Sequence, residues 1–199
     1  MRKESDYLGS LEIPEDALYG THSLRARENF PDNSLFHKEW YQAMGLVKQA
    51  CYMTYHEFVH TAKNDTELKL KEFNFLPNHI IETLTSVATE VHNGDYFNHF
   101  IVPAIQGGAG TSINMNVNEI IANASLLKLG HKAGDYKIID PIEHANIFQS
   151  TNDVVPTALR IAAVRLLVLL EESINNTRAR FEGLEKDHRN SLRIGYTQM

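Results

Sequence analysis

Apolar residues recur at three- and four-residue spacing along several stretches of the chain, which is the pattern of amphipathic helices. In residues 37–62 these positions are Trp40, Met44, Val47, Cys51, Tyr55 and Val59. Similar patterns predict a helix from Pro77 to Asn93-Gly94, a short helical piece over 95–101, and a helix with apolar positions from Val117 to Leu129. The sequence therefore predicts a mainly all-α fold.

The last predicted helix, from about residue 152 to about residue 192, has an unusually wide apolar surface. Ile161, Ala162, Val164 and residues 166–170 cover most of its circumference. A helix that is apolar nearly all round is buried on several sides, and this one would be roughly 60 Å long at 1.5 Å per residue. We therefore expect it either to overhang the rest of the chain or to belong to a larger bundle.

Two parts of the chain lack a helical period. Residues 1–35 are expected to be irregular, and 130–143 are expected to form a loop with a small extended piece at Tyr136–Ile139. No stretch shows the strong alternation of apolar and polar residues that a half-buried strand would give.

Composition and charge narrow the class of protein. The chain has 199 residues, a formal net charge of −6 and one cysteine, Cys51. The negative charge disfavours nucleic acid and anionic membranes as partners, and one cysteine cannot form an intrachain disulfide. The charged N-terminus does not resemble a secretory signal, and no apolar run has the length of a membrane span. We expect a cytoplasmic protein.

Five short polar residues, Gln149-Ser150-Thr151-Asn152-Asp153, lead into the apolar segment from Ala158 to Leu170. Polar groups at the mouth of a buried helix are costly unless they are bound. Hydroxyl and amide groups offer donors and acceptors without a fixed charge. This stretch therefore predicts a site for a small carboxylate or amide ligand.

A glycine-rich segment, Gly107 to Ser112, precedes the predicted helix that contains Val117. Converging backbone N–H groups and an electropositive helix start would favour an anion there. The segment matches neither a P-loop nor a dinucleotide fingerprint, and a plain turn is the alternative. Asn114 and Asn118 share one helix face, where they either bond a specific group or only solvate the first turn.

Histidines provide two weaker signals. His56-Glu57-Phe58-Val59-His60 has the spacing of a zinc-protease helix, with Glu82 as a conceivable third ligand, but the wider motif is missing. A surface pair of histidines is the favoured interpretation, and no metal site is predicted. His144 lies just before the polar stretch and is a further candidate for contact with a substrate carboxylate.

Several segments together resemble the aspartase/fumarase superfamily, and its aspartate ammonia-lyase branch most closely. They include the opening Asp16-Ala17-Leu18-Tyr19-Gly20 and Leu24 to Phe30, the Gly-Thr-Ser-x-Asn-Met-Asn motif at Gly110–Asn116, the Gln-Ser-Thr-Asn-Asp motif at Gln149–Asp153, and Gly-x-Thr-Gln at Gly195–Gln198. The resemblance implies an N-terminal helical domain over 1–151 and, over 152–199, the start of a central helical bundle.

The resemblance also implies a reaction and a site. The reaction would be reversible anti β-elimination of ammonia from L-aspartate to give fumarate, without a cofactor, in a homotetramer whose active sites combine three subunits. Substrate would be bound by Thr111, Ser112, Asn114, Ser150, Thr151, Asn152, Thr197 and Gln198. Ala109 and Gln198 favour an aspartase over a fumarate hydratase, although Tyr196 replaces the arginine usual in the family.

The family's third signature, which carries the serine base and a carboxylate-binding lysine, does not occur in residues 1–199. Relatives run to more than twice this length, so we expect a fragment that is inactive alone, with its catalytic serine beyond Met199. A fumarate hydratase or another superfamily lyase is the first alternative. A helical interaction or scaffold protein that docks through its apolar helix is the non-enzyme alternative. We also expect the fragment to self-associate through 158–170, because that face is apolar and has no partner in the sequence.

Overall fold

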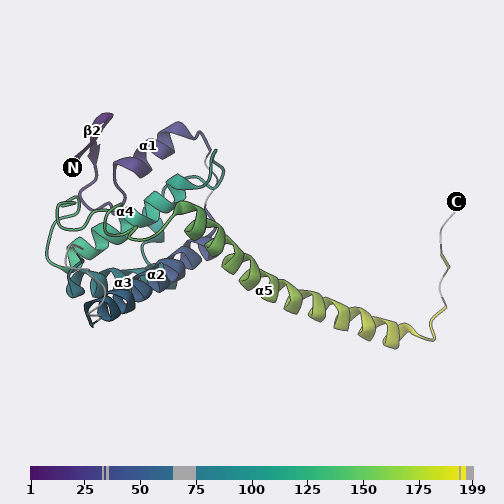
Figure 1. The fold of residues 1–199 in the computed structure, drawn as a ribbon. Coiled ribbons are helices and arrows are strands. Elements are labelled where there is room, and N and C mark those ends of the chain that lie inside the picture. Colours follow the sequence, from purple (N-terminus) through teal and green to yellow (C-terminus); the bar gives the residue numbers. More distant parts are fainter. Residues whose placement is uncertain (33, 35, 65–74, 193, 196–199) are drawn as a thin grey trace. The chain divides into compact units, whose positions relative to one another are not determined.

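The computed structural model describes residues 1–32, 34, 36–64, 75–192 and 194–195. The elements in chain order are β1 (Arg2–Asp6), β2 (Gly9–Ile13), α1 (Thr21–Asn29), α2 (Lys38–Asn64), α3 (Asn78–Asn93), the 3₁₀ helix η2 (Phe97–His99), α4 (Thr111–Lys128) and α5 (Thr151–His188). Figure 1 shows them along the chain. Two compact units, Met1–Ala162 and Ala163–Met199, divide the chain, and α5 contributes residues to both.

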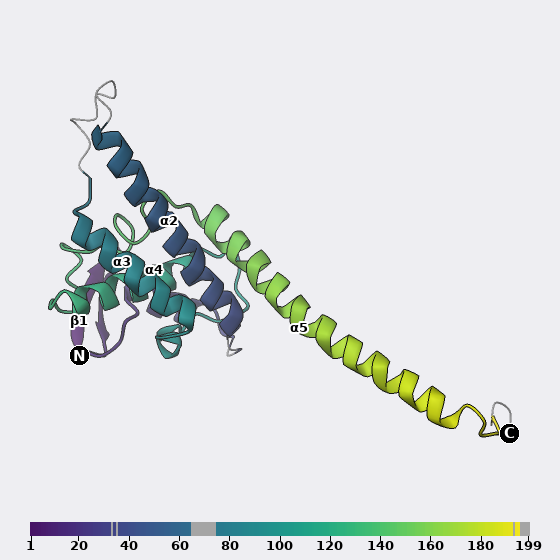
Figure 2. The same ribbon diagram turned by 90° about the horizontal axis from the view of Figure 1, so that it is seen from below.

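Helices α2, α3 and α4 pack side by side in the first unit and enclose its apolar core (Figures 1 and 2). The buried face of α3 consists of Ile80, Ile81, Leu84, Val87, Ala88 and Val91. The backbones of α2 and α3 approach closely at Gly45, where an added Cβ would lie 2.9 Å from the Ala88 carbonyl oxygen. Because each buried Leu or Val contributes about 1.5–3 kcal/mol, this core supplies a stable scaffold for the polar groups described below.

Helix α4 is enclosed on all sides, and every residue from Ile113 to Leu126 is buried. Two of its asparagines, Asn116 and Asn123, satisfy backbone groups of surrounding loops. The Asn116 Oδ1 atom accepts a 2.8 Å hydrogen bond from the backbone N–H of Ile101. Asn123 donates a 2.8 Å bond to the Leu18 carbonyl. These amides thus act as the internal partners that buried loop groups require.

The expectation of an irregular N-terminal region is wrong, because β1 and β2 form an antiparallel hairpin and α1 follows it. The apolar pattern missed the hairpin because two inward positions of β1 carry charges: Arg2 and Glu4 are only 9% and 7% exposed. Arg2 Nε donates a 2.7 Å bond to Glu4, and Arg2 Nη1 donates a 2.6 Å bond to the Ala17 carbonyl. A buried charge is tolerated when it is paired in this way.

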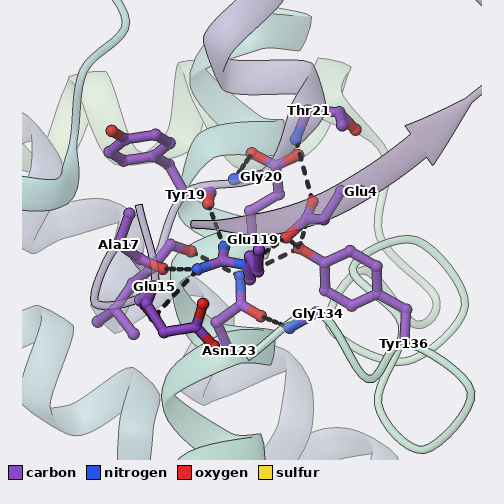
Figure 3. Close-up of polar contacts among 12 residues, drawn as sticks. Glu4, Glu15, Ala17, Tyr19, Gly20, Thr21, Glu119, Asn123, Gly134 and Tyr136 are labelled. Atoms are coloured by element: carbon purple, nitrogen blue, oxygen red, sulfur yellow. Dashed lines mark hydrogen bonds and ion pairs between the residues drawn. The ribbon is translucent and has the colours of Figure 1, made fainter. Parts of the chain in front are cut away.

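The first turn of α1 is held by Glu119, a buried residue of α4 (Figure 3). Its carboxylate accepts hydrogen bonds from the backbone N–H groups of Gly20 at 2.8 Å, His22 at 3.0 Å and Ser23 at 3.2 Å. These are N–H groups that a helix cannot satisfy internally. Desolvation raises the pKa of Glu119, and the hydrogen bonds from Ser23, Gly20 and His22 oppose that rise. A single core carboxylate therefore fixes a helix that has little apolar surface of its own.

The other predicted helices are confirmed as α2, α3, η2, α4 and α5, with ends within a few residues of those expected. The prediction of a small extended piece at Tyr136–Ile139 is wrong, since these residues form turns. Its apolar side chains turn inward without strand pairing: Ile139 is fully buried, and Tyr136 OH lies 3.0 Å from Asn123 Nδ2. Among the described helices, none combines the length and apolarity that a membrane crossing requires.

The second unit, described by itself, is helical as far as His188. Its side chains from Leu167 to Leu170 are 52–60% exposed, and Phe181 further along is 68% exposed. The wide apolar surface predicted from the sequence is therefore present on the helix. Burying such side chains is favourable by about 1.5–3 kcal/mol each.

Candidate functional site

Two of the sequence motifs meet at the N-termini of α4 and α5. Asn114, in the first turn of α4, donates from Nδ2 to the Thr151 hydroxyl oxygen at 3.2 Å. Thr151 is the first residue of α5. Asn114 is 1% exposed, whereas Thr151 is partly exposed. The hydrogen bond therefore connects a buried amide to a hydroxyl at the surface.

Asn146 determines the direction of this hydrogen bond. Its Nδ2 donates a 2.9 Å bond to the backbone carbonyl of Gln149, so its Oδ1 is the atom left to accept from Asn114 Nδ2 at 3.0 Å. Asn114 must therefore present its amide nitrogen to both Asn146 and Thr151. Because the Thr151 oxygen accepts, its hydroxyl hydrogen remains available to donate. The Asn114 Oδ1 atom is buried without a hydrogen-bond partner among the described residues.

A glycine makes the close approach of the two helices feasible. Gly110, just before α4, has a φ of +83°, in the left-handed region that side chains rarely adopt. A Cβ added there would lie 2.9 Å from Val155 Cγ1 in α5. The Trp40 indole N–H donates a 3.2 Å bond to the Val155 carbonyl. The glycine-rich segment thus places the start of α4 directly against α5, a role that the sequence pattern alone did not reveal.

The remaining predicted residues of the two motifs lie at the same helix ends. The Ser150 carbonyl accepts 3.0 Å bonds from the N–H groups of Asp153 and Val154, and its hydroxyl oxygen accepts from the Asn152 N–H at 3.2 Å. Ser150 therefore caps α5 in the manner of a helix N-cap. Ser150, Asn152 and Thr111 are exposed, and Ser112 is partly exposed.

Both helix N-termini carry partial positive charge from unsatisfied N–H groups. Since Asn114 and Thr151 join the first turns of α4 and α5, the two positive ends lie close together. Uncharged hydroxyls surround them, and the one acidic side chain in the first turn of α5, Asp153, is exposed. This arrangement is suited to a small anion with several hydrogen-bond acceptors.

A buried lysine lies beneath the second motif and was missed in the sequence. Lys48 of α2 is fully buried, and its Nζ donates a 2.8 Å bond to Gln149 Oε1. Burial lowers the pKa of Lys48 to about 7, against a smaller opposing effect of Cys51. Lys48, Gln149 and Asn146 are therefore linked by hydrogen bonds to Asn114 and so to the site. Its position in the sequence could have revealed it, because Lys48 falls on the apolar face of the helix predicted over 37–62.

Other candidates lie elsewhere or are outside the described residues. Among the described residues, Asn118 donates to the Met115 sulfur, at 3.6 Å, and shares no bonded group with Asn114. His144 Nδ1 accepts a 2.8 Å bond from the backbone N–H of Asp140, which stabilises the turn before the second motif. Thr197 and Gln198 lie outside the described residues.

In the histidine pair of α2, His56 is partly exposed and His60 is exposed. No group of three or more His, Cys, Asp or Glu side chains is placed to hold a metal ion within the described part of the chain. His56, Glu57 and Glu82 line an open groove of about 680 Å³ between α2 and α3. His60 is exposed and lies outside the lining of that groove. These positions agree with the interpretation as surface histidines.

Comparison with protein families identifies one match over nearly the whole chain. A family model described as "Lyase" matches residues 9–199. Aspartate ammonia-lyase of Escherichia coli strain K12 is 38% identical and that of Bacillus subtilis strain 168 is 36% identical, each over 100% of this chain. The chain spans 39% of the length of both relatives.

Solved structures give the same relationship. The fumarate lyase:delta crystallin from Brucella melitensis bound to cobalt has a TM-score of 0.85 and 34% identity, covering 99% of this chain and 40% of that one. The class II fumarase from Schistosoma mansoni has a TM-score of 0.67 and 25% identity, covering 81% of this chain and 31% of that one. The fold described above is thus found in proteins more than twice as long.

Proposed function

Because this chain belongs to the lyase family whose model matches residues 9–199, we propose that it forms part of an aspartate ammonia-lyase. The longer protein would eliminate ammonia from L-aspartate and release fumarate, and would add ammonia in the reverse direction. Identity of 34–38% to aspartate ammonia-lyases over the whole chain supports this activity. We expect no cofactor, and a cytoplasmic location.

The observation that supports this function best is the hydrogen bond from Asn114 to the Thr151 oxygen. Because that oxygen accepts, the Thr151 hydroxyl hydrogen can donate to a substrate. The two carboxylates of L-aspartate offer only acceptor oxygens, so they need hydrogen-bond donors that are already oriented. Thr151, Ser150 and the N–H groups at the starts of α4 and α5 supply uncharged donors at one place. Such donors are well suited to stabilise a carboxylate whose negative charge increases in the transition state.

We assign substrate contacts to the residues of both motifs and to the segment that follows α5. The proposed contact residues are Thr111, Ser112, Asn114, Ser150, Thr151, Asn152, Thr197 and Gln198, with His144 as a further candidate. Asn114 would act mainly by orienting Thr151, because it is 1% exposed. Proton removal is assigned to a serine in a part of the longer protein that residues 1–199 do not include.

We further propose that residues 1–151 form the N-terminal domain of the lyase and that 152–199 begin its central helical bundle. The exposed apolar side chains of α5 from Leu167 to Leu170 would then be covered in a homotetramer. Sharing each active site among subunits would explain why donors are present here without a base. Residues 1–199 alone are therefore expected to bind weakly and to catalyse no elimination.

The proposal can be tested by following fumarate formation from L-aspartate in the full-length protein. Thr151→Val removes the free donor and should lower kcat/KM by about 10²–10³-fold, the usual effect of losing one oriented donor. Thr151→Ser keeps the hydroxyl and should retain most activity. Thr157→Val, an exposed position in the same helix, is the matched control.

The same assay separates the alternative function. Similarity to a class II fumarase favours hydration of fumarate as the second candidate. Formation of fumarate from L-malate, with none from L-aspartate, would replace the first assignment by the second. A full-length protein that turns over neither substrate would favour a non-enzymatic interaction protein.

A further inference from the structure

Lys48 places an ionisable amino group in the interior of the first unit. Its side chain is fully buried in α2, and Gln149 Oε1 is its one hydrogen-bond acceptor among the described residues. Lysines are almost never fully buried unless they are paired, and moving an ammonium out of water is costly. No carboxylate forms an ion pair with Lys48 in the described part of the chain.

The lysine fixes the orientation of the Gln149 amide. Lys48 Nζ donates to Gln149 Oε1 at 2.8 Å, so the Gln149 amide turns its oxygen toward α2. Gln149 Nε2 then donates to the Ala145 carbonyl at 3.3 Å, and the same carbonyl accepts from the Tyr52 hydroxyl. The Gln149 side chain is therefore held from α2 at one end and from the preceding turn at the other.

Gln149 passes this constraint on to the site. Its backbone carbonyl accepts the 2.9 Å bond from Asn146 that orients Asn114 and, through it, Thr151. Its peptide leads directly into Ser150, which caps α5. A continuous set of hydrogen bonds thus runs from α2 through the turn to α4 and α5.

The cost of this arrangement favours a functional role over a purely structural one. An apolar side chain of similar length would fill the same space without burying a charge, and such replacements are often neutral or stabilising. Among the residues that the structure describes, Gln149 is the acceptor that Lys48 contacts. The Lys48 amino group therefore acts to hold the Gln149 side chain in place.

We propose that Lys48 is a positioning residue of the substrate site, which holds Gln149 so that Ser150, Thr151 and Asn152 present their donors to the substrate. The inference rests on the proposed lyase function. Lys48 itself touches no substrate, and its effect passes through Gln149 and Asn146. Loss of Lys48 would leave the fold intact and let the 149–152 stretch move.

The test uses the full-length protein with Lys48→Met, Gln149→Leu and the double variant. A displacement of about 1 Å in a site can cost about 10²-fold in rate, so each single variant should lose kcat/KM for L-aspartate on that order. The double variant should lose no more than either single variant, because both break the same link. Lys132→Met, at an exposed lysine, is the control.

Thermal unfolding of each variant separates positioning from folding. Lys48→Met is expected to melt at or above the wild-type temperature, because the buried charge is gone, while its activity falls. Wild-type activity retained in Lys48→Met, or additive losses in the double variant, would overturn the proposal. If Lys48→Met fails to fold, Gln149→Leu alone decides, and full activity in it is the contradicting result. Absence of turnover in the wild type would instead refute the proposed function.

Discussion

The amide of Asn114 donates to the hydroxyl of Thr151 at 3.2 Å, across a sequence separation of 37 residues. This bond joins the first turns of α4 and α5. It also leaves the Thr151 hydrogen free to donate outward, because the oxygen is already accepting. The polarity of the candidate site thus originates in a buried residue rather than in the exposed residues that would touch a ligand.

Asn114→Ala should destabilise the chain by about 1–3 kcal/mol, because it removes a buried amide and leaves the partly buried Asn146 oxygen without its donor. Asn152→Ala, at an exposed position of the second motif, should change the free energy of unfolding by no more than about 0.5 kcal/mol. Urea unfolding of both variants measures the difference. Equal effects of the two substitutions would show that the Asn114 bonds contribute nothing to stability.

Gly110→Ala should destabilise through two separable effects. Its φ of +83° disfavours a side chain, and the new methyl would lie 2.9 Å from Val155 Cγ1. Overpacking of this kind typically costs about 1–3 kcal/mol. Gly108→Ala, with a φ of +94° and no atom within 4 Å of the added Cβ, isolates the backbone effect.

Truncating Val155 checks the packing effect directly. In a Val155→Ala background the Gly110→Ala substitution should cost only as much as Gly108→Ala. Urea unfolding of the four proteins gives the coupling between Gly110 and Val155. An unchanged cost in that background would mean that the two helices are not in contact as described.

Lys48 should give the chain a characteristic pH dependence of stability. Its pKa in the folded state is about 7, below its ordinary value of 10.5. Between these values the unfolded chain binds more protons, so the free energy of unfolding rises with pH. The rise is at most about 1.4 kcal/mol per pH unit. Below pH 7 the cost of the buried charge is fully present.

Comparison with Lys48→Met isolates that contribution. The difference in unfolding free energy between wild type and variant, measured in urea from about pH 6 to about pH 9, should favour the wild type increasingly as pH rises. Other titrating groups cancel in the difference. A difference that is independent of pH would show that Lys48 keeps its ordinary pKa in the folded chain.

Glu119→Ala should weaken the attachment of α1. The substitution leaves the N–H groups of Gly20, His22 and Ser23 without their acceptor, and unsatisfied buried donors cost about 1–3 kcal/mol each. Hydrogen exchange at these three amides should accelerate. Glu172→Ala, at an exposed glutamate of α5, should leave the exchange of these amides unchanged.

Much of the helical fold and two parts of the site were predictable from sequence. Helices α2, α3 and α4 carry their apolar residues at helical spacing, and the core buries those faces. The hairpin was not predictable, because Arg2 and Glu4 occupy its inward positions. Helix α1 was missed because its first turn depends on Glu119, which is remote in sequence.

By itself, the sequence determined the helical elements, the polar motifs at Gly110–Asn116 and Gln149–Asp153, and the family to which the chain belongs. Those features are local, since periodicity, helix capping and motif order are all properties of neighbouring residues. Only the tertiary structure decided that Asn114 orients Thr151, that Val155 packs closely against Gly110, and that Lys48 donates a hydrogen bond to Gln149. Such contacts depend on how buried helices approach each other, and no local pattern specifies that distance.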